Sequence, residues 1–327
     1  MAVVRGTAPK GKMTELHEAT PSSLAHLIGM REVVDQVGVG IEAAFADGKK
    51  FDDALLVGGA GLGKTQTAKV IAAEMAGGLQ EVLGQAISSA ADLNALLLGA
   101  TERGVVFIDE AHELPKEQQT ALYLALDQRR ITIGGGKGGR STQSIGVANF
   151  TLLLATTDEH ALLSPLRDRM KLTLRFGFYA DDDLATLTRQ RSRGLGWVTD
   201  DAVFPQIARR ARGTPRLALR LLQAARRVCR AEGDEDITLS HLERACVLEN
   251  IDGLGLGTVE QQYLAVLSEG ASRLNMIASR LGLPARTVCQ VTEPILIRLG
   301  LVEKDEQGRR VVTAKGREHL HQRVQGV

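Results

Sequence analysis

The stretch that most constrains this chain is residues 57–65, which read Val-Gly-Gly-Ala-Gly-Leu-Gly-Lys-Thr. An apolar run at 54–57 precedes it, and a segment with helical periodicity at 67–74 follows it. In the order strand, glycine loop and helix, the pattern Gly-x-x-x-x-Gly-Lys-Thr predicts a phosphate-binding loop. The glycines let successive amides point at one anion, and the helix N-terminus adds its dipole. The chain is therefore expected to bind a nucleoside triphosphate.

The polar residues of this loop have distinct expected roles. Lys64 would reach the β- and γ-phosphates of ATP, and the Thr65 hydroxyl would ligate Mg²⁺. The backbone at Gly58, Gly61 and Gly63 would wrap around the phosphates. A flexible turn between strand and helix is the alternative, and the Lys-Thr pair with both flanks in place disfavours it.

Length and composition limit the remaining possibilities. A chain of 327 residues is long for one domain, so two or three domains are expected. No apolar run approaches the roughly 20 residues of a membrane span, and the basic N-terminus lacks the apolar segment of a secretory signal. The three cysteines are widely spaced, which favours reduced thiols and a cytoplasmic location. With a net charge of +1, any contact with DNA must come from a local basic patch.

A second motif follows the loop by about 45 residues, at 104–112 (Gly-Val-Val-Phe-Ile-Asp-Glu-Ala-His). Its apolar half predicts a buried parallel strand that delivers two carboxylates at the carboxyl edge of a sheet. Asp109 is expected to hold Mg²⁺ through water, and Glu110 to orient and polarise the attacking water. An acid pair alone is a weak signal, but in this position it turns nucleotide binding into hydrolysis.

Three further segments bear on the site. Residues 134–139 form a dense glycine cluster between two β-prone runs, which predicts either a mobile hairpin or a disordered loop. Residues 150–157 predict a third buried strand, ending in two threonines, one of which would sense the γ-phosphate. Residues 164–169 (Ser-Pro-Leu-Arg-Asp-Arg) present two arginines, one of them a candidate finger for a neighbouring subunit's site.

These motifs, followed by Ala-Arg-Gly-Thr-Pro-Arg at 211–216, resemble the RuvB family of AAA+ ATPases, which drive branch migration of Holliday junctions. The resemblance extends from about residue 20 to residue 319. The phosphate loop and the acid pair occur in many ATPases. The sequences at 164–169 and 212–216 are far more specific to this family.

The resemblance implies roles for individual residues. Thr157 becomes the first γ-phosphate sensor, Arg169 the arginine finger that acts in trans, and Arg216 a second sensor on the lid. Tyr179 would lie near the base. The remaining implied nucleotide contacts are Ala19, Thr20, Gln66, Asp127, Gln128 and Arg129. Lys304 and Arg309 match the family's DNA-contacting arginines.

The chain departs from the family pattern at several positions. Gly59 and Ala60 replace two prolines, which leaves a looser loop. Ala19 and Thr20 replace the adenine-side pair Ile-Arg. Asp158 replaces an arginine after the sensor, and Met170 replaces a phenylalanine after the finger. None of these changes removes a catalytic group, and together they indicate a divergent member of the family.

The fold class expected is α/β: an AAA+ P-loop ATPase domain at 19–179 after an N-terminal tail at 1–18, a helical lid at 180–250 and a C-terminal winged-helix domain at 258–327. Four capped helices are expected in the lid. Residues 251–257 are rich in glycine and predict a flexible linker. Beyond the linker, three helices and a short hairpin predict a winged helix, a fold that binds either DNA or protein.

Two functions remain open at this point. The favoured one is an ATP-driven DNA motor: a homohexameric ring that works on Holliday junctions with a RuvA-type junction-binding protein and a RuvC-type resolvase. The glycine-rich hairpin would contact the RuvA-type partner. The alternative is an AAA+ remodelling or clamp-loader-like switch whose winged helix binds protein. An inactive scaffold is a third, weaker reading.

Overall fold

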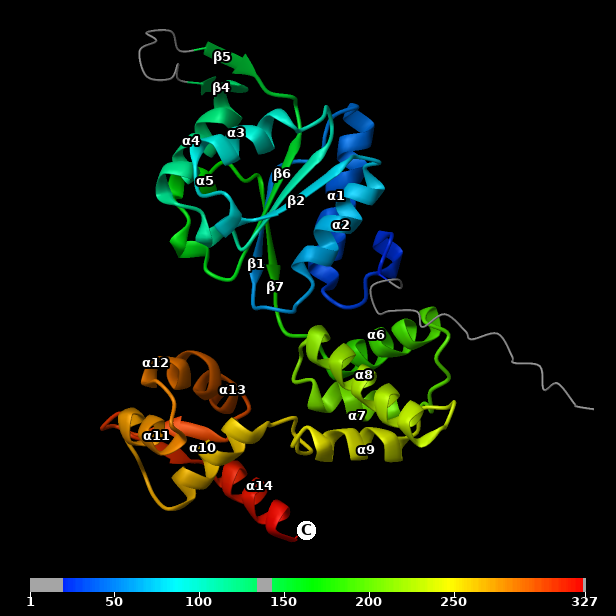
Figure 1. Ribbon diagram of the computed structural model, residues 1–327, viewed down its shortest axis with the longest axis vertical. Helices are drawn as coiled ribbons and strands as arrows, with labels where there is room; N and C mark the ends of the chain where they lie inside the picture. The colour runs from blue at the N-terminus through cyan, green and yellow to red at the C-terminus, as the bar shows by residue number, and fades with distance from the viewer. Residues whose placement is uncertain (1–19, 134–142, 326–327) are drawn as a thin grey trace, which may run out of the picture. The chain divides into compact units, whose positions relative to one another are not determined.

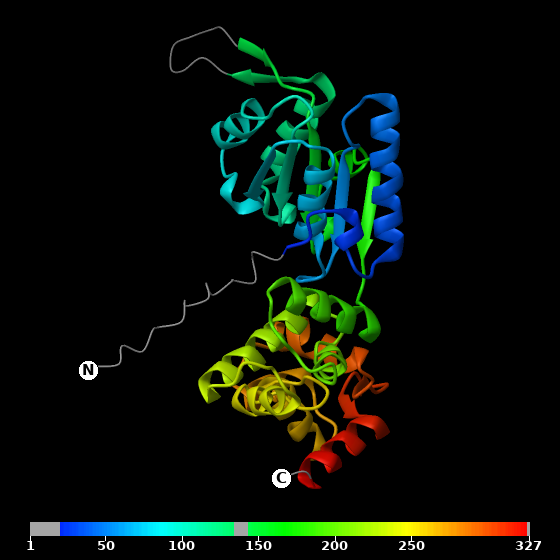
Figure 2. The same ribbon diagram turned by 90° about the vertical axis from the view of Figure 1, so that its right-hand side faces the viewer.

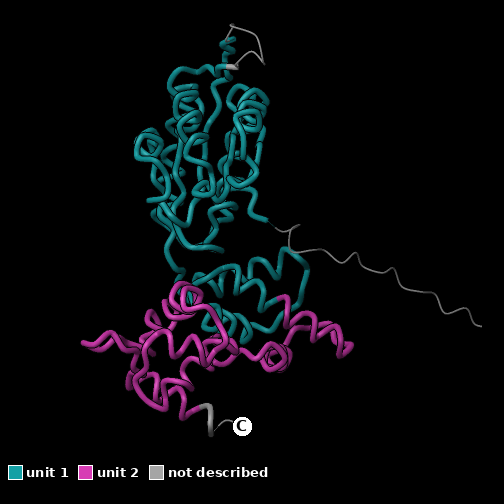
Figure 3. The backbone as a smooth tube through the Cα atoms, turned by 60° about the vertical axis from the view of Figure 1, so that its left-hand side comes forward, with its two compact units in different colours: residues 1–222 teal, residues 223–327 magenta. Residues whose placement is uncertain are grey.

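The computed structural model describes residues 20–133 and 143–325, and the chain divides into two compact units, residues 1–222 and 223–327 (Figure 3). The glycine cluster at 134–139 and Ala19 lie outside the described residues.

A five-stranded parallel sheet forms the centre of the first unit (Figure 1). Its order is β2-β3-β6-β1-β7, so β1 and β6 are interior strands and β2 and β7 are edges. Because all four strand pairs are parallel, the carboxyl ends of the strands meet at one edge of the sheet. The strands are β1 (Ala54–Gly58), β2 (Leu79–Leu83), β3 (Val105–Asp109), β6 (Thr151–Thr156) and β7 (Leu172–Phe176).

Helices cover both faces of this sheet (Figure 1). On one face lie α1 (Arg31–Asp47) and α2 (Lys64–Glu74), and Figure 2 shows α1 running beside the edge strand β7. On the other face lie α3 (Ala90–Leu98), α4 (Lys116–Gln128) and the short α5 (Ser164–Arg167). The buried side of α1 consists of Val33, Val37, Ile41 and Ala44, which recur at helical spacing.

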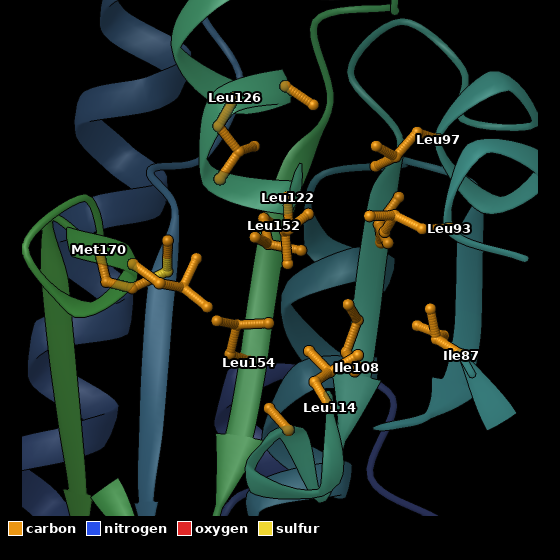
Figure 4. Packing of buried hydrophobic residues seen from close by; sticks show 14 of the residues in the cluster. Ile87, Leu93, Leu97, Ile108, Leu114, Leu122, Leu126, Leu152, Leu154 and Met170 are labelled. Carbon is orange, nitrogen blue, oxygen red and sulfur yellow. The ribbon is translucent and has the colours of Figure 1, made fainter. Parts of the chain in front are cut away.

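Side chains of β6 alternate between two hydrophobic cores. Leu152 and Leu154 point to the core under α3 and α4, where Figure 4 shows Leu152 beside Leu122 and Leu154 further along the same strand. Leu153 and Ala155 belong to the opposite core, under α1 and α2. Every residue of β6 is buried, which is why its sequence is apolar on both faces.

In the first unit, β2 differs from the sequence expectation, whereas the expected hairpin around the glycine cluster is present as a pair of strands. The polar stretch after α2 contains β2, which was not expected because its residues are half exposed at the edge of the sheet. The β-prone runs around the glycine cluster do pair, as β4 (Arg130–Ile133) and β5 (Gln143–Gly146), in an antiparallel ladder. The tip between them is outside the described residues.

The four expected lid helices are present as α6 (Asp181–Gly194), α7 (Val203–Arg210), α8 (Pro215–Glu232) and α9 (Leu239–Leu248). The first three begin in the first unit, and α9 belongs to the second. No helix in the described ranges has the length and apolar character needed to span a bilayer.

The C-terminal part of the second unit is a winged helix. Its three helical segments are α10 (Thr258–Ser268), α11 (Leu274–Leu281) and a third made of α12 (Ala285–Thr287), the π-helical η6 (Val288–Thr292) and α13 (Glu293–Arg298). The wing pairs β8 (Val302–Lys304) with β9 (Arg310–Val312). A further helix that the sequence did not suggest, α14 (Ala314–Gln325), follows the wing.

The segment 251–257 is a folded turn in place of the expected flexible linker. Asp252 accepts the amides of Leu254 and Leu256 at 2.9 Å, and its carboxylate also lies 2.9 Å from His319 Nε2 on α14. Leu256 is fully buried in the core of the winged helix. The glycines of this segment therefore lie in a turn whose leucines pack against the winged-helix core.

Candidate functional site

The phosphate-binding loop connects β1 to α2 at the carboxyl edge of the sheet. Gly61 and Gly63 have φ angles of 78° and 104°, a left-handed region that side chains rarely adopt. Lys64 begins α2, and its Nζ donates to Gly58 O at 2.6 Å and to Gly59 O at 2.9 Å. Burial lowers the pKa of Lys64, and the nearby Glu110 and Asp109 carboxylates oppose that effect. Through its hydrogen bonds to Gly58 O and Gly59 O, the Lys64 side chain lies across the loop, next to the expected phosphate site.

The two expected Mg²⁺ ligands lie together. Thr65 Oγ donates to Asp109 Oδ2 at 2.9 Å, and the Glu110 amide donates to Asp109 Oδ1 at 2.9 Å. A hydroxyl and a carboxylate at one point are the oxygen donors that Mg²⁺ prefers. Glu110 has a left-handed backbone (φ 50°), which turns the chain out of β3 into η4 (Ala111–Glu113).

A residue without an expected role, His112, joins this group. Its Nδ1 lies 3.4 Å from Glu110 Oε2 and 3.2 Å from Thr156 Oγ. Thr156 ends β6 and is fully buried, whereas Thr157, the expected sensor, is the next residue and is exposed. The histidine was visible in the sequence beside the acid pair, but only the alignment of β3 with β6 brings it to Thr156.

Tyr179 and Arg216 close over the loop from the lid side. Tyr179 Oη donates to Leu62 O at 3.2 Å, and burial, followed by the charge of Asp183, raises the pKa of Tyr179 to about 12. The Arg216 amide donates to Gly61 O at 3.3 Å. Both residues therefore contact the loop, whereas their expected roles, near the base for Tyr179 and at the γ-phosphate for Arg216, stay predictions. Gln66 follows Thr65 in α2, and Thr20 is exposed at the start of the described chain.

The remaining expected site residues form a second group on α4 and after α5. Arg169 Nε donates to Asp127 Oδ1 at 2.7 Å, and the guanidinium lies 4.7 Å from the centroid of the Tyr123 ring. Arg129 lies over the Phe150 ring, 5.8 Å from its centroid, and Gln128 ends α4. Within the described part of the chain, no hydrogen bond or ion pair joins this group to the phosphate-loop group.

Two of the departures from the family pattern have structural roles. Asp158 Oδ1 accepts the amides of His160 at 3.0 Å and Ala161 at 3.3 Å, and so caps η5 (Glu159–Ala161). Met170 is buried in the core under α3 and α4 (Figure 4). Neither side chain takes part in the groups described above.

The cations of the wing are paired with carboxylates of the same chain. Lys304 Nζ lies 2.9 Å from Glu293 Oε1, and Arg310 Nε lies 2.7 Å from Glu293 Oε2. Glu293 is 2% exposed; burial raises its pKa, but hydrogen bonds from Arg310 and Lys304 lower it by more. Arg309 Nε donates to Asp305 Oδ2 at 2.7 Å. Lys304 and Arg309 are each about half exposed and each keep N–H donors beyond these pairs, so a DNA phosphate could bind beside the carboxylates.

A cluster of possible metal ligands, Glu232, Asp234 and His241, is better explained as a helix cap. The Thr238 amide donates to His241 Nδ1 at 3.0 Å, so Nδ1 carries no hydrogen. The hydrogen is then on Nε2, which lies 3.0 Å from Asp234 Oδ2 and 3.1 Å from Glu232 Oε2. A nitrogen that donates to two carboxylates is not available to a metal ion.

Comparison with known proteins assigns the three parts of the chain to consecutive family models. The Holliday junction DNA helicase RuvB P-loop domain matches residues 19–176, the RuvB AAA lid domain matches 179–252 and the RuvB C-terminal winged helix domain matches 253–321.

Curated relatives and solved structures agree with these matches. The chain is 37% identical over 320 residues to the Holliday junction branch migration complex subunit RuvB 2 of Synechococcus sp. (strain JA-3-3Ab), covering 95% of this chain and 86% of the relative. It is 37% identical over 305 residues to RuvB of Mycobacterium avium (strain 104), covering 92% and 87%. A Thermotoga maritima RuvB mutant superposes with a TM-score of 0.80 at 32% identity, covering 92% of this chain and 98% of that one. The Thermotoga maritima RuvB Holliday junction branch migration motor gives 0.78 at 31% identity, with coverage of 93% and 98%.

Proposed function

This chain belongs to the RuvB family of AAA+ ATPases, and on that basis we propose that it is an ATP-driven DNA motor for branch migration of Holliday junctions in recombination and repair. The observation that carries the proposal is the meeting of the phosphate loop, the acid pair, Tyr179 and Arg216 at one edge of the sheet. We further propose an ATPase domain at 19–179, a lid at 180–250, a folded connecting segment at 251–257 and a winged helix at 258–327, in a cytoplasmic protein.

In the proposed mechanism, the loop amides and Lys64 hold the β- and γ-phosphates of ATP, and Tyr179 lies against the base. Glu110 orients a water for in-line attack on the γ-phosphate, so no covalent intermediate is needed. Thr65 and Asp109 would hold Mg²⁺, which neutralises phosphate charge. Thr157 senses the γ-phosphate, and Arg216 supplies positive charge to it from the lid.

The separation of the two groups supports a site shared between protomers. In the described chain no hydrogen bond or ion pair joins Arg169, Asp127, Gln128 or Arg129 to the phosphate-loop group, and Arg169 is paired with Asp127. We infer that an arginine finger in this position acts on the γ-phosphate of the neighbouring subunit. The proposed assembly is therefore a homohexameric ring, working on junction DNA with a RuvA-type partner and a RuvC-type resolvase.

The proposal is tested on the wing. Changing Lys304 and Arg309 together to Ala should remove junction-stimulated ATP hydrolysis and branch migration while basal hydrolysis remains, because the wing lies outside the ATPase domain. The measurements are phosphate release with and without junction DNA, and strand exchange on a synthetic junction. The control is Glu110→Gln, which should abolish both basal and stimulated hydrolysis.

A second candidate function is an AAA+ switch that remodels a protein partner. One observation favours it: Lys304 and Arg309 are each paired with a carboxylate of their own chain, Glu293 and Asp305. If junction DNA leaves the turnover of the wild-type protein unchanged, this alternative replaces the motor. If no ATP is hydrolysed under any condition, both fail.

A further inference from the structure

His112 lies where the ends of two neighbouring strands meet. It lies in η4, two residues after Glu110, and its ring reaches Thr156 at the end of β6. The Nδ1 atom lies 3.2 Å from Thr156 Oγ and 3.4 Å from Glu110 Oε2. One ring nitrogen is therefore shared between the proposed water-orienting carboxylate and the strand that leads to the proposed sensor.

The direction of these hydrogen bonds follows from Thr156. Its Oγ donates to Asp158 O at 2.9 Å and accepts the Asp158 amide at 3.0 Å. A hydroxyl has one hydrogen, so Oγ must act as an acceptor toward His112, and Nδ1 must carry a hydrogen. A carboxylate only accepts, so the same N–H also suits Glu110.

The turn held by Thr156 connects two parts of the proposed mechanism. It contains Thr157, the proposed γ-phosphate sensor, between the residues that the Thr156 hydroxyl joins. Asp158 then caps η5, which leads into α5 and on to Arg169. A change at Thr157 on nucleotide binding would therefore act on a turn that is bonded to the ring beside Glu110.

From this geometry we propose that His112 is a positioning residue that couples γ-phosphate sensing to the alignment of Glu110. Its Nδ1–H holds the Glu110 carboxylate in a fixed relation to the Thr156–Asp158 turn. The inference rests on the proposed ATPase function and deepens it. Because a displacement of about 1 Å at a reacting centre costs about 100-fold in rate, loss of the His112–Glu110 contact should appear in kcat and not in ATP binding.

The first experiment compares two substitutions of His112. His112→Leu removes the N–H, and His112→Asn keeps an amide N–H close to the position of Nδ1. We expect kcat to fall about 10- to 100-fold in His112→Leu with KM for ATP and Tm unchanged, and to recover in His112→Asn. Glu113→Gln is the matched control, because Glu113 is exposed and lies 3.5 Å from Nε2 on the other side of the ring; its kcat should equal that of the wild type.

A double-mutant cycle tests the coupling to Thr156. Thr156→Val removes the hydroxyl and should lower kcat, whereas Thr156→Ser keeps it and should not. In the His112→Leu background, Thr156→Val should add nothing, since the two residues act through one contact.

Failure of the proposed role of His112 and failure of the proposed ATPase function give different results. Additive effects in the cycle, a wild-type kcat in His112→Leu, or equal losses of kcat and Tm in the Leu and Asn variants would each overturn the inference alone. A wild-type protein that does not hydrolyse ATP would overturn the proposed function itself.

Discussion

At the residue scale, Gly61 is the point where the phosphate loop and the lid touch. Its φ angle is 78°, and a Cβ added there would lie 2.7 Å from Arg216 Cβ. A side chain at this position would therefore strain the loop and push Arg216 away. Gly59, two residues earlier, lacks a left-handed φ, and an added Cβ would meet the end of the Leu62 side chain at 3.3 Å.

We predict that Gly61→Ala weakens ATP binding by about 10-fold or more, because the change combines backbone strain with displacement of the lid contact. Gly59→Ala should change binding little, since Leu62 can rotate. Titration with a fluorescent ATP analogue measures both variants. Equal affinities for the two would show that the Gly61–Arg216 contact does not shape the site.

Some of the site residues can be predicted from the sequence, and others depend on tertiary packing. Lys64, Thr65 and Asp109 follow from motifs, because the chemistry of each depends on a short local pattern and the strand that precedes it. The pairing of Arg169 with Asp127 depends on the packing of α5 against α4 and has no local signal. The same is true of Lys304 with Glu293, where the wing folds back onto the third helix.

At the element scale, α1 carries two glycines in different surroundings. An added Cβ at Gly38 meets no atom within 4 Å, whereas at Gly40 it would lie 2.7 Å from Phe51 Cε2. Phe51 is fully buried in the core under α1 and α2, so its ring has little room to move.

We expect Gly38→Ala to stabilise the protein by about 0.5–1 kcal/mol, the usual gain of alanine over glycine inside a helix. Gly40→Ala should destabilise it by about 1–3 kcal/mol, because the methyl group overpacks the core. Thermal unfolding of the two variants, which differ only in position on one helix, measures the difference. A stabilising Gly40→Ala would mean that α1 does not pack on Phe51 as described.

The stability of the turn at 251–257 is expected to depend on pH through the carboxyl group of Asp252. Burial raises the pKa of Asp252, but the hydrogen bonds from His319 and from the amides of Leu256 and Leu254 lower it by more, so its pKa lies below the usual value. The charged carboxylate therefore contributes stability that is fully present above the unfolded pKa of about 3.9 and is lost as the pH falls through the lower folded pKa.

We predict that the amides of Leu254 and Leu256 exchange with solvent about 10-fold faster or more in Asp252→Asn than in the wild type at pH 7, since the neutral amide is a weaker acceptor. The difference should begin to shrink as the pH falls below about 3.9 and should vanish once the pH has passed through the lower folded pKa, where the wild-type carboxyl is also neutral. Hydrogen exchange of this segment at pH 7 and at pH 3 provides the test. A difference that does not depend on pH would assign the effect to packing alone.

Secondary structure was mispredicted where the conformation of a segment depends on its tertiary neighbours and not on its own composition. The parallel strands β1, β3 and β6 are apolar on both faces and were recognisable, whereas the edge strand β2 is half exposed and reads as a loop. The glycines of 253–257 suggested flexibility. However, Leu256 is buried in a core most of whose other residues lie far from it in the sequence, so no local pattern indicates the burial.

At the scale of the whole molecule, the chain carries two groups of proposed site residues that do not meet within the described structure. Arg169 is held by Asp127 on its own chain, which occupies the guanidinium with a carboxylate in place of a phosphate. Transfer of Arg169 to a neighbour's γ-phosphate would exchange one anion for another of higher charge. Hydrolysis should therefore depend on assembly and not on the isolated chain.

This dependence can be tested by mixing two inactive variants. Arg169→Ala keeps its own Lys64 and Glu110 but lacks the finger, and Glu110→Gln keeps the finger but cannot orient the attacking water. If the finger acts in trans, each variant alone should hydrolyse ATP at least about 100-fold more slowly than the wild type, since arginine fingers contribute about 10³–10⁵ to kcat. In mixed rings, an Arg169→Ala protomer beside a Glu110→Gln neighbour regains a complete site, so activity should rise with mixing and peak at an intermediate ratio. If the finger acts within its own chain, every protomer of the mixture lacks one essential group, and the activity of the mixture stays at the level of its components.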